Sequence, residues 1–125
     1  MKEVNMKSKW LEHNGKKIFY QDFSNNFFDD NSVKQELEEV QAIVLSQPED
    51  SILVLSNFMN TEITTNLMSI LNDSSKLTKP HVKKTAVLGV TGIKRTLADL
   101  LSKITGQPLM YFTTETEAME WLTKE

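Results

Sequence analysis

The chain has 125 residues, 25 % of them charged, with a net charge of −3 and no cysteine. This length favours a single domain, and the negative net charge argues against nucleic acid as the main partner, because neutralising phosphates requires a basic surface. The absence of cysteine excludes disulfides, thiolate catalysis and cysteine–metal sites, and it suits a cytoplasmic location.

The N-terminal part of the chain predicts a polar start followed by a β-hairpin. Residues 1–5 are expected to be flexible. No signal peptide or membrane span is indicated, since no apolar run reaches the ~18 residues of a membrane helix. Residues 6–12 and 17–23 are short runs with aromatic and aliphatic side chains. Between them, Asn14-Gly15 accepts positive φ at both central positions of a type I′ turn, which predicts a hairpin.

A first helix is predicted from about Ser32 to Ser46, ending before Pro48. The loop before it, residues 24–31, contains Asp and Asn side chains that can cap the helix. The evidence for the helix is a set of apolar residues at helical spacing: Val33, Leu37, Val40 and Val44.

Two pairs of residues in the loop before this helix have more than one interpretation. Phe27 and Phe28 can form an exposed binding patch, or they can fold onto the helix start as a hydrophobic staple, and we favour the staple. Asp29 and Asp30 can contribute to a metal site, but adjacent acids before a helix are usually caps.

The middle of the chain predicts two strands that are buried on both faces. Residues 52–55 and 85–90 are apolar at consecutive positions rather than at alternate ones. Between them, a turn over residues 57–61 leads into a second helix over residues 63–75, with Asn60 or Thr61 as its cap. The apolar residues of that helix are Ile63, Leu67, Ile70 and Leu71.

The last part of the chain predicts a third helix over residues 93–104, a short strand over residues 109–112 and a terminal helix opened by a Thr114-x-x-Glu117 capping box. The order β-β-α-β-α-β-α-β-α predicts an α/β fold in which the hairpin is followed by mostly parallel strands alternating with four helices. Because the middle strands are apolar on both faces, helices or a second subunit should cover both faces. A homodimer is therefore one expectation.

The most informative loop follows the strand at residues 85–90. Ligands of open α/β sheets bind outside the carboxyl ends of the strands, and here Thr91 and Gly92 open a helix whose free N–H groups attract anions. Lys94 and Arg95 are cations in the first turn, where the helix dipole disfavours them by up to about 1 kcal/mol each. These four residues form a candidate anion or ligand site. The more common alternative is that Gly92 only serves the turn and that the two cations pair with nearby acids.

Thr61 is a candidate phosphorylation site, because a phosphate at the start of the second helix would meet a favourable dipole. A helix cap is the simpler role for this residue. His13 and His81 lie in predicted loops without metal-ligand spacing, and we expect them to be solvated. No catalytic constellation, metal site or cofactor motif is recognisable, so no enzyme activity is predicted.

Three segments, residues 83–94, 112–115 and 118–122, resemble the SpoIIAA-like family of the STAS fold, which is related in architecture to the lipid-binding CRAL-TRIO domains. The resemblance covers roughly residues 6–123. It implies that residues 1–125 form one STAS domain, a βα superhelix with helices packed largely along one face of the sheet. It also implies a small cytoplasmic bacterial protein that binds and regulates rather than catalyses.

The resemblance leaves three functional hypotheses. The first is a non-enzymatic binding or regulatory module that acts through the loops at residues 57–62 and 90–95. The second is a phosphorylation-switched anti-sigma-factor antagonist: that class carries Asp-Ser where Asn60-Thr61 stands here, and the serine is phosphorylated by a partner kinase. The third, by analogy with the lipid binders, is a carrier of a small apolar or anionic ligand.

Overall fold

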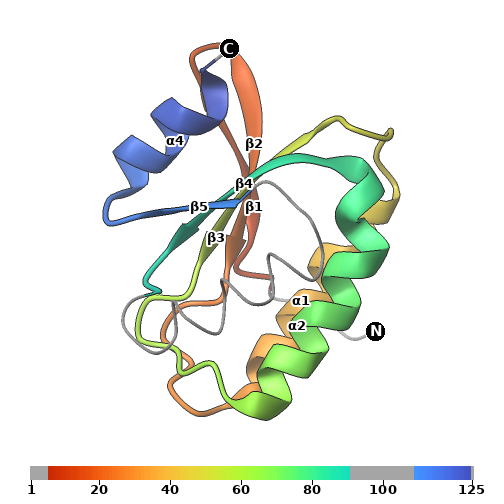
Figure 1. Ribbon diagram of the computed structural model, residues 1–125, viewed down its shortest axis with the longest axis vertical. Coiled ribbons are helices and arrows are strands. Elements are labelled where there is room, and N and C mark those ends of the chain that lie inside the picture. The colour runs from red at the N-terminus through yellow and green to blue at the C-terminus, as the bar shows by residue number, and fades with distance from the viewer. Residues whose placement is uncertain (1–5, 91–108, 125) are drawn as a thin grey trace.

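The computed structural model describes residues 6–90 and 109–124 (Figure 1). Within these residues the chain forms a five-stranded mixed sheet and three helices, which confirms an α/β fold. The helix predicted over residues 93–104 lies outside the described residues. The elements are β1 (Lys9–His13), β2 (Lys16–Asp22), α1 (Asp30–Leu45), β3 (Ile52–Asn57), α2 (Thr65–Thr78), the 3₁₀ helix η1 (Lys79–His81), β4 (Val82–Leu88), β5 (Leu109–Phe112) and α4 (Glu115–Thr123).

The sheet has the strand order β1-β2-β3-β4-β5. The hairpin strands β1 and β2 are antiparallel, and every other neighbouring pair is parallel. At the hairpin tip Asn14 and Gly15 have φ angles of 51° and 75°, which confirms the predicted turn. The parallel strands end in register, so that their carboxyl ends form one row across the sheet: Asp22, Asn57, Leu88 and Phe112.

Helices cover both faces of the sheet (Figure 1). The core on the side of α1 and α2 contains Phe19, Val54 and Val87, and the core on the side of α4 contains Ile18, Leu55 and Ala86. Neighbouring residues of one strand therefore point into different cores, which explains the apolar runs without alternation. Among the described helices, α1 and α2 lie on one face and α4 lies on the other. That helices pack largely along one face stays a prediction.

Two of the predicted helix caps are present. Asp29 caps α1, since its Oδ1 atom accepts a hydrogen bond from Ser32 N at 3.1 Å. Thr114 caps α4 by accepting from Glu117 N at 3.2 Å, and its hydroxyl donates to Glu117 Oε1 at 2.9 Å. Thr114 thus caps α4 as predicted, with Glu117 bonded to its hydroxyl, and the carboxylate of Asp29 has the structural role that the sequence favoured.

The start of α2 was predicted wrongly. Its cap is Thr64, whose Oγ1 atom accepts from Leu67 N at 3.0 Å, and neither Asn60 nor Thr61 caps the helix. The reason is that residues 58–63 continue alongside the loop that follows β2 before the chain turns into α2. Strand β4 also begins three residues earlier than predicted and includes Lys83 and Lys84.

Candidate functional site

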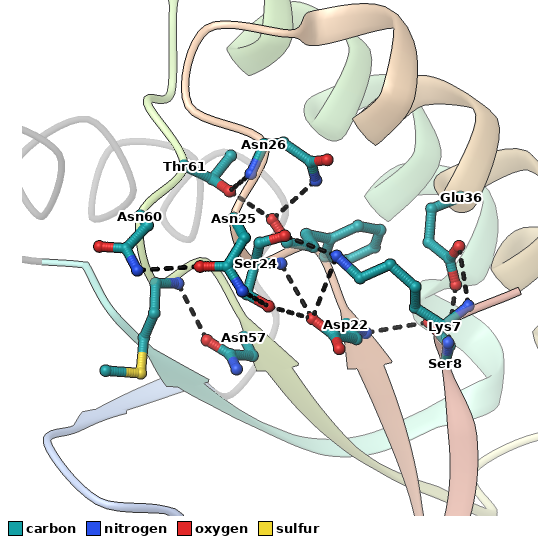
Figure 2. A network of polar contacts seen from close by, with 12 residues as sticks. Lys7, Ser8, Asp22, Ser24, Asn25, Asn26, Glu36, Asn57, Asn60 and Thr61 are labelled. Carbon is teal, nitrogen blue, oxygen red and sulfur yellow. Dashed lines mark hydrogen bonds and ion pairs between the residues drawn. The ribbon is translucent and has the colours of Figure 1, made fainter.

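The candidate site consists of two loops at the carboxyl ends of β2 and β3 (Figure 2). We call residues 23–29 the β2–α1 loop and residues 58–64 the β3–α2 loop. Backbone hydrogen bonds continue the parallel pairing of the two strands into these loops, so each loop fixes the other. These bonds run from Phe23 N to Asn57 O (2.9 Å), Asn25 N to Met59 O (2.8 Å), Phe27 N to Asn60 O (2.8 Å) and Glu62 N to Phe27 O (2.6 Å).

Backbone strain is concentrated in the same two loops. Asn25, Phe27 and Asn60 have φ angles of 60°, 51° and 58°. Asparagine tolerates this left-handed region, but for an aromatic residue it is disfavoured by roughly 1–2 kcal/mol. The conformation of Phe27 persists because its N–H and its C=O are both bonded to the β3–α2 loop.

Side chains add a second layer of contacts between the loops. Thr61 is only 1 % exposed, and its Oγ1 atom donates to Phe23 O at 2.5 Å and accepts from Asn26 N at 3.1 Å. Asn60 Nδ2 donates to Asn25 Oδ1 at 2.9 Å. Figure 2 shows Thr61 and Asn60 where the β2–α1 and β3–α2 loops meet. Phosphorylation of Thr61 stays a prediction, and it requires a state in which the loops separate and release the hydroxyl.

The N-terminal segment is bonded to the end of β2, to the β2–α1 loop and to α1. Asp22 Oδ1 accepts from the hydroxyl of Ser24 at 2.5 Å and lies 3.8 Å from Lys7 Nζ, which itself donates to Ser24 O at 2.6 Å. On α1, the buried Glu36 accepts from Ser8 N at 2.8 Å and from Lys7 N at 3.2 Å. The sequence did not reveal this role of Glu36, since its neighbours Glu38 and Glu39 are ordinary exposed helix residues.

Three large apolar side chains are exposed on the two loops. Phe27 is 63 % exposed, Phe28 75 % and Met59 47 %, and we call these three residues the apolar tip. The hydrophobic staple that we favoured for Phe27 and Phe28 is therefore wrong, and both side chains are exposed as the alternative required, whereas a role in binding stays a prediction. The physical reason is that the Phe27 backbone pairs with the β3–α2 loop instead of folding onto α1.

Acidic residues lie beside the apolar tip. Asp29 and Asp30 follow Phe28 directly, and Glu62 N is bonded to the carbonyl of Phe27. Hydrogen bonds from the side chain and backbone of Ser32 hold the pKa of Asp29 below its ordinary value, so this carboxylate is ionised at neutral pH. The tip therefore carries an acidic flank.

Gly89, the residue that follows β4, lies in close contact with Met59 of the β3–α2 loop. Gly89 has a φ of +79°, and a Cβ atom built at this position would lie only 2.4 Å from Met59 N. Glycine is required here for both reasons. The predicted anion site that follows, Thr91, Gly92, Lys94 and Arg95, lies outside the described residues and stays a prediction.

The structure changes the interpretation of the histidines. His13 Nε2 lies 2.9 Å from Glu120 Oε1 on α4, and His81 Nδ1 lies 2.7 Å from Gln47 O. Both histidines are partly exposed, as expected for solvated residues, but each also makes a hydrogen bond: His13 with α4, and His81 with the segment that follows α1. Across residues 6–90 and 109–124, no group of three or more His, Asp or Glu side chains is placed to hold a metal ion.

A partly open cavity of about 100 Å³ lies between the sheet and the helices α1 and α2. Its described lining is largely apolar and includes Val40, Leu71 and Val87. Typical small-molecule sites measure roughly 300–1,000 Å³, so this cavity does not favour a carrier of a lipid-sized ligand. Within the same described part of the chain, no helix has the length and hydropathy to cross a membrane.

No protein-family model, curated protein or solved structure matches the chain. The resemblance to the SpoIIAA-like family therefore rests on the residues of the chain alone and stays a hypothesis. A mixed α/β sheet supports many functions, so function has to be argued from the surface features of this chain.

Proposed function

We propose that this protein is a non-enzymatic binding module of the regulatory, STAS (SpoIIAA-like) type, and that it docks a basic protein surface through the apolar tip. The observation that carries the proposal is the exposure of Phe27, Phe28 and Met59 on a backbone that is already fixed by hydrogen bonds. Aromatic residues dominate the energy of protein interfaces, and a preformed loop loses little conformational freedom on binding.

The charge around the tip indicates the chemistry of the partner. Asp29 and Asp30 directly follow Phe28, and the exposed Asp29 carboxylate is ionised, so the complementary surface is an apolar pocket with lysine or arginine beside it. The same charges disfavour an anionic membrane surface. Met59 also lies within residues 57–62, one of the two loops that the sequence indicated as an interaction surface.

Site-specific crosslinking tests this proposal. A photoreactive phenylalanine analogue at Phe28 should crosslink one protein in cells of the source organism, whereas the same analogue at Leu77, which is exposed on α2, should not. With the purified partner, Phe28→Ser should weaken binding about tenfold or more, and Leu77→Ser less than about twofold. Equal crosslinking at both positions would contradict the proposal, and a crosslink to a second copy of the chain would indicate homodimerisation instead.

A second candidate function is the phosphorylation-switched antagonist. The observation that favours it is that the Thr61 hydroxyl joins the two loops that carry the apolar tip. A phosphate on this oxygen would remove the hydrogen that Thr61 donates to Phe23 O, and its bulk and charge would not fit the buried position, so the docking surface would change. Intact-mass measurement of the protein from its native cells tests this alternative: an added phosphate located on Thr61 supports it, and an unmodified Thr61 under all growth conditions argues against it.

A further inference from the structure

Among the described strands, β1 lies at one end of the sheet order and pairs only with β2. Phe23 N donates to Asn57 O, so the odd-numbered residues of β2 direct their backbone groups towards β3, and the even-numbered ones direct theirs towards β1. Even-numbered residues of β2 lie opposite odd-numbered residues of β1. The backbone N–H and C=O groups of Trp10 and Glu12 therefore point away from the sheet.

This free side of β1 is open to a further strand. β1 contains no proline, and its register with β2 contains no bulge, two features that often block such pairing. Trp10 stacks on Phe19, with 4.7 Å between the ring centroids, and is still 41 % exposed. Within residues 6–90 and 109–124, no hydrogen bond reaches the outward backbone groups of Trp10 or Glu12. Solvent or a second chain has to satisfy these groups.

A second copy of β1 fits this free side. With a two-fold axis at Leu11, the outward groups of Trp10 would bond to those of the second copy's Glu12, and the symmetric bonds would form as well. The two Leu11 side chains would lie directly opposite each other on the face that α4 covers, where Leu11 already packs against the apolar cluster. Backbone hydrogen bonds would thus flank an apolar pair at the axis.

Charge complementarity supports the same register. It places the exposed Lys9 opposite the second copy's His13, and the Nε2 atom of His13 lies 2.9 Å from Glu120 Oε1 in its own chain. Glu120 is itself exposed, so its carboxylate is accessible to Lys9 of the other copy. The two-fold axis forms this ion pair twice.

The two neighbouring registers match less well. An axis at Trp10 would put Lys9 against the apolar Leu11, and an axis at Glu12 would put two carboxylates against each other. We propose that the protein forms a symmetric homodimer in which two β1 strands pair antiparallel about Leu11 and join the two sheets into one. The interface uses no residue of the apolar tip.

Sedimentation equilibrium of the full chain tests the dimer, and a dissociation constant below about 100 µM is expected for such a short pairing. Disulfide trapping tests the register, because the chain has no cysteine of its own. Opposed Cα atoms of a non-hydrogen-bonded pair lie about 4.5 Å apart, which suits a disulfide. Leu11→Cys should therefore form a linked dimer at least about tenfold faster than the control Glu12→Cys, whose two copies lie more than about 7 Å apart.

A charge exchange tests the contact between Lys9 and Glu120. Lys9→Glu should weaken dimerisation about tenfold, because it opposes two carboxylates at both symmetric contacts, and Lys9→Glu/Glu120→Lys should restore it to within about threefold. Lys34→Glu, which reverses an exposed charge on α1, is the control and should change the dissociation constant by less than about twofold. Phe28→Ser should also leave it unchanged, which separates the dimer from the docking proposal.

Three outcomes would overturn the proposal. One is a monomer at every concentration up to about 1 mM. Another is faster trapping of Glu12→Cys than of Leu11→Cys, since the two strands would then not pair about Leu11. The third is a dimer that Lys9→Glu does not weaken, because the interface would then lie elsewhere on the molecule.

Discussion

The two edges of the sheet differ in almost every physical property. At the carboxyl edge, two loops are joined by backbone hydrogen bonds, and they present exposed apolar side chains with an acidic flank. At the amino edge, the strands begin beside an open groove lined with lysines. Parallel strands bring all of their starts to one edge and all of their ends to the other. The comparison teaches that the two ends of one set of parallel strands can present different side chains, exposed apolar residues beside acids at one edge and several lysines at the other.

The largest effect should come from the tight contact at the carboxyl edge. Gly89→Ala should lower the free energy of unfolding by about 3 kcal/mol or more, because its Cβ would meet the backbone of Met59 and its φ is +79°. Gly15→Ala is the matched control, since its φ is +75° but nothing lies within 4 Å of the new Cβ. It should lose only about 1–2 kcal/mol. Urea unfolding measures both, and equal losses would show that the close approach is unimportant.

Substitutions of Thr61, which joins the two loops, should have the next largest effect on the free energy of unfolding. Thr61→Val removes both hydrogen bonds of a buried hydroxyl and leaves Phe23 O and Asn26 N with one partner fewer, so we expect a loss of about 2 kcal/mol. Thr61→Ser keeps the hydroxyl and should lose about 1 kcal/mol through its missing methyl group. Hydrogen exchange at Asn25 and Phe27 should accelerate only in the valine variant. Similar exchange in both variants would contradict the role of the hydroxyl.

At the amino edge, two adjacent lysines provide a sharper comparison. Lys84→Met loses the bonds to the end of α4 and the contact with Trp121, and it should destabilise the protein by about 1–2 kcal/mol. Lys83→Met removes an exposed charge and should change stability by less than about 0.5 kcal/mol. Urea unfolding decides between them. If Lys83→Met were the more damaging change, the assignment of the contacts with α4 to Lys84 alone would be wrong.

The smallest effect is a pH dependence. The hydrogen bond from His13 lowers the pKa of Glu120 below its ordinary value of 4.5. A carboxylate with a lowered pKa stabilises the folded state above its unfolded pKa, and this contribution disappears as the pH falls through the folded value. As the pH is lowered below about 4.5, the urea concentration at the midpoint of unfolding should therefore decrease, and it should decrease less in Glu120→Gln. The effect is small because Glu120 is exposed. An identical fall in the variant would exclude Glu120 as a source.

Local sequence signals predicted the framework of the fold. Asn14-Gly15 placed the hairpin, Asp29 and Thr114 marked two helix starts, and consecutive apolar residues identified the buried strands. Each of these signals acts over a few neighbouring residues, so it can be recognised without knowing the tertiary structure. The mixed sheet followed from the alternation of strands and helices.

The features of the candidate site depend on contacts between distant segments. Phe27 is exposed because its backbone pairs with residues more than thirty positions later in the chain. Glu36 is buried because the N-terminal segment bonds to it. Lys84, on β4, donates to a carbonyl at the end of α4, about forty residues later in the chain. Spacing within one element does not reveal such partners. This is why the staple at Phe27 and the cap at Thr61 were predicted wrongly, and why the hydrogen bonds of the two histidines were not foreseen.

The backbone pairing between the β2–α1 and β3–α2 loops has a consequence for how the lengths of these loops can vary. Surface loops usually tolerate insertions, because a change in one of them disturbs no other segment. Here an added residue in either loop would move every later amide out of line with its carbonyl partner. The two loops can therefore change length only together, and an insertion before Thr64 should be accepted only when a compensating residue is added before Asp29.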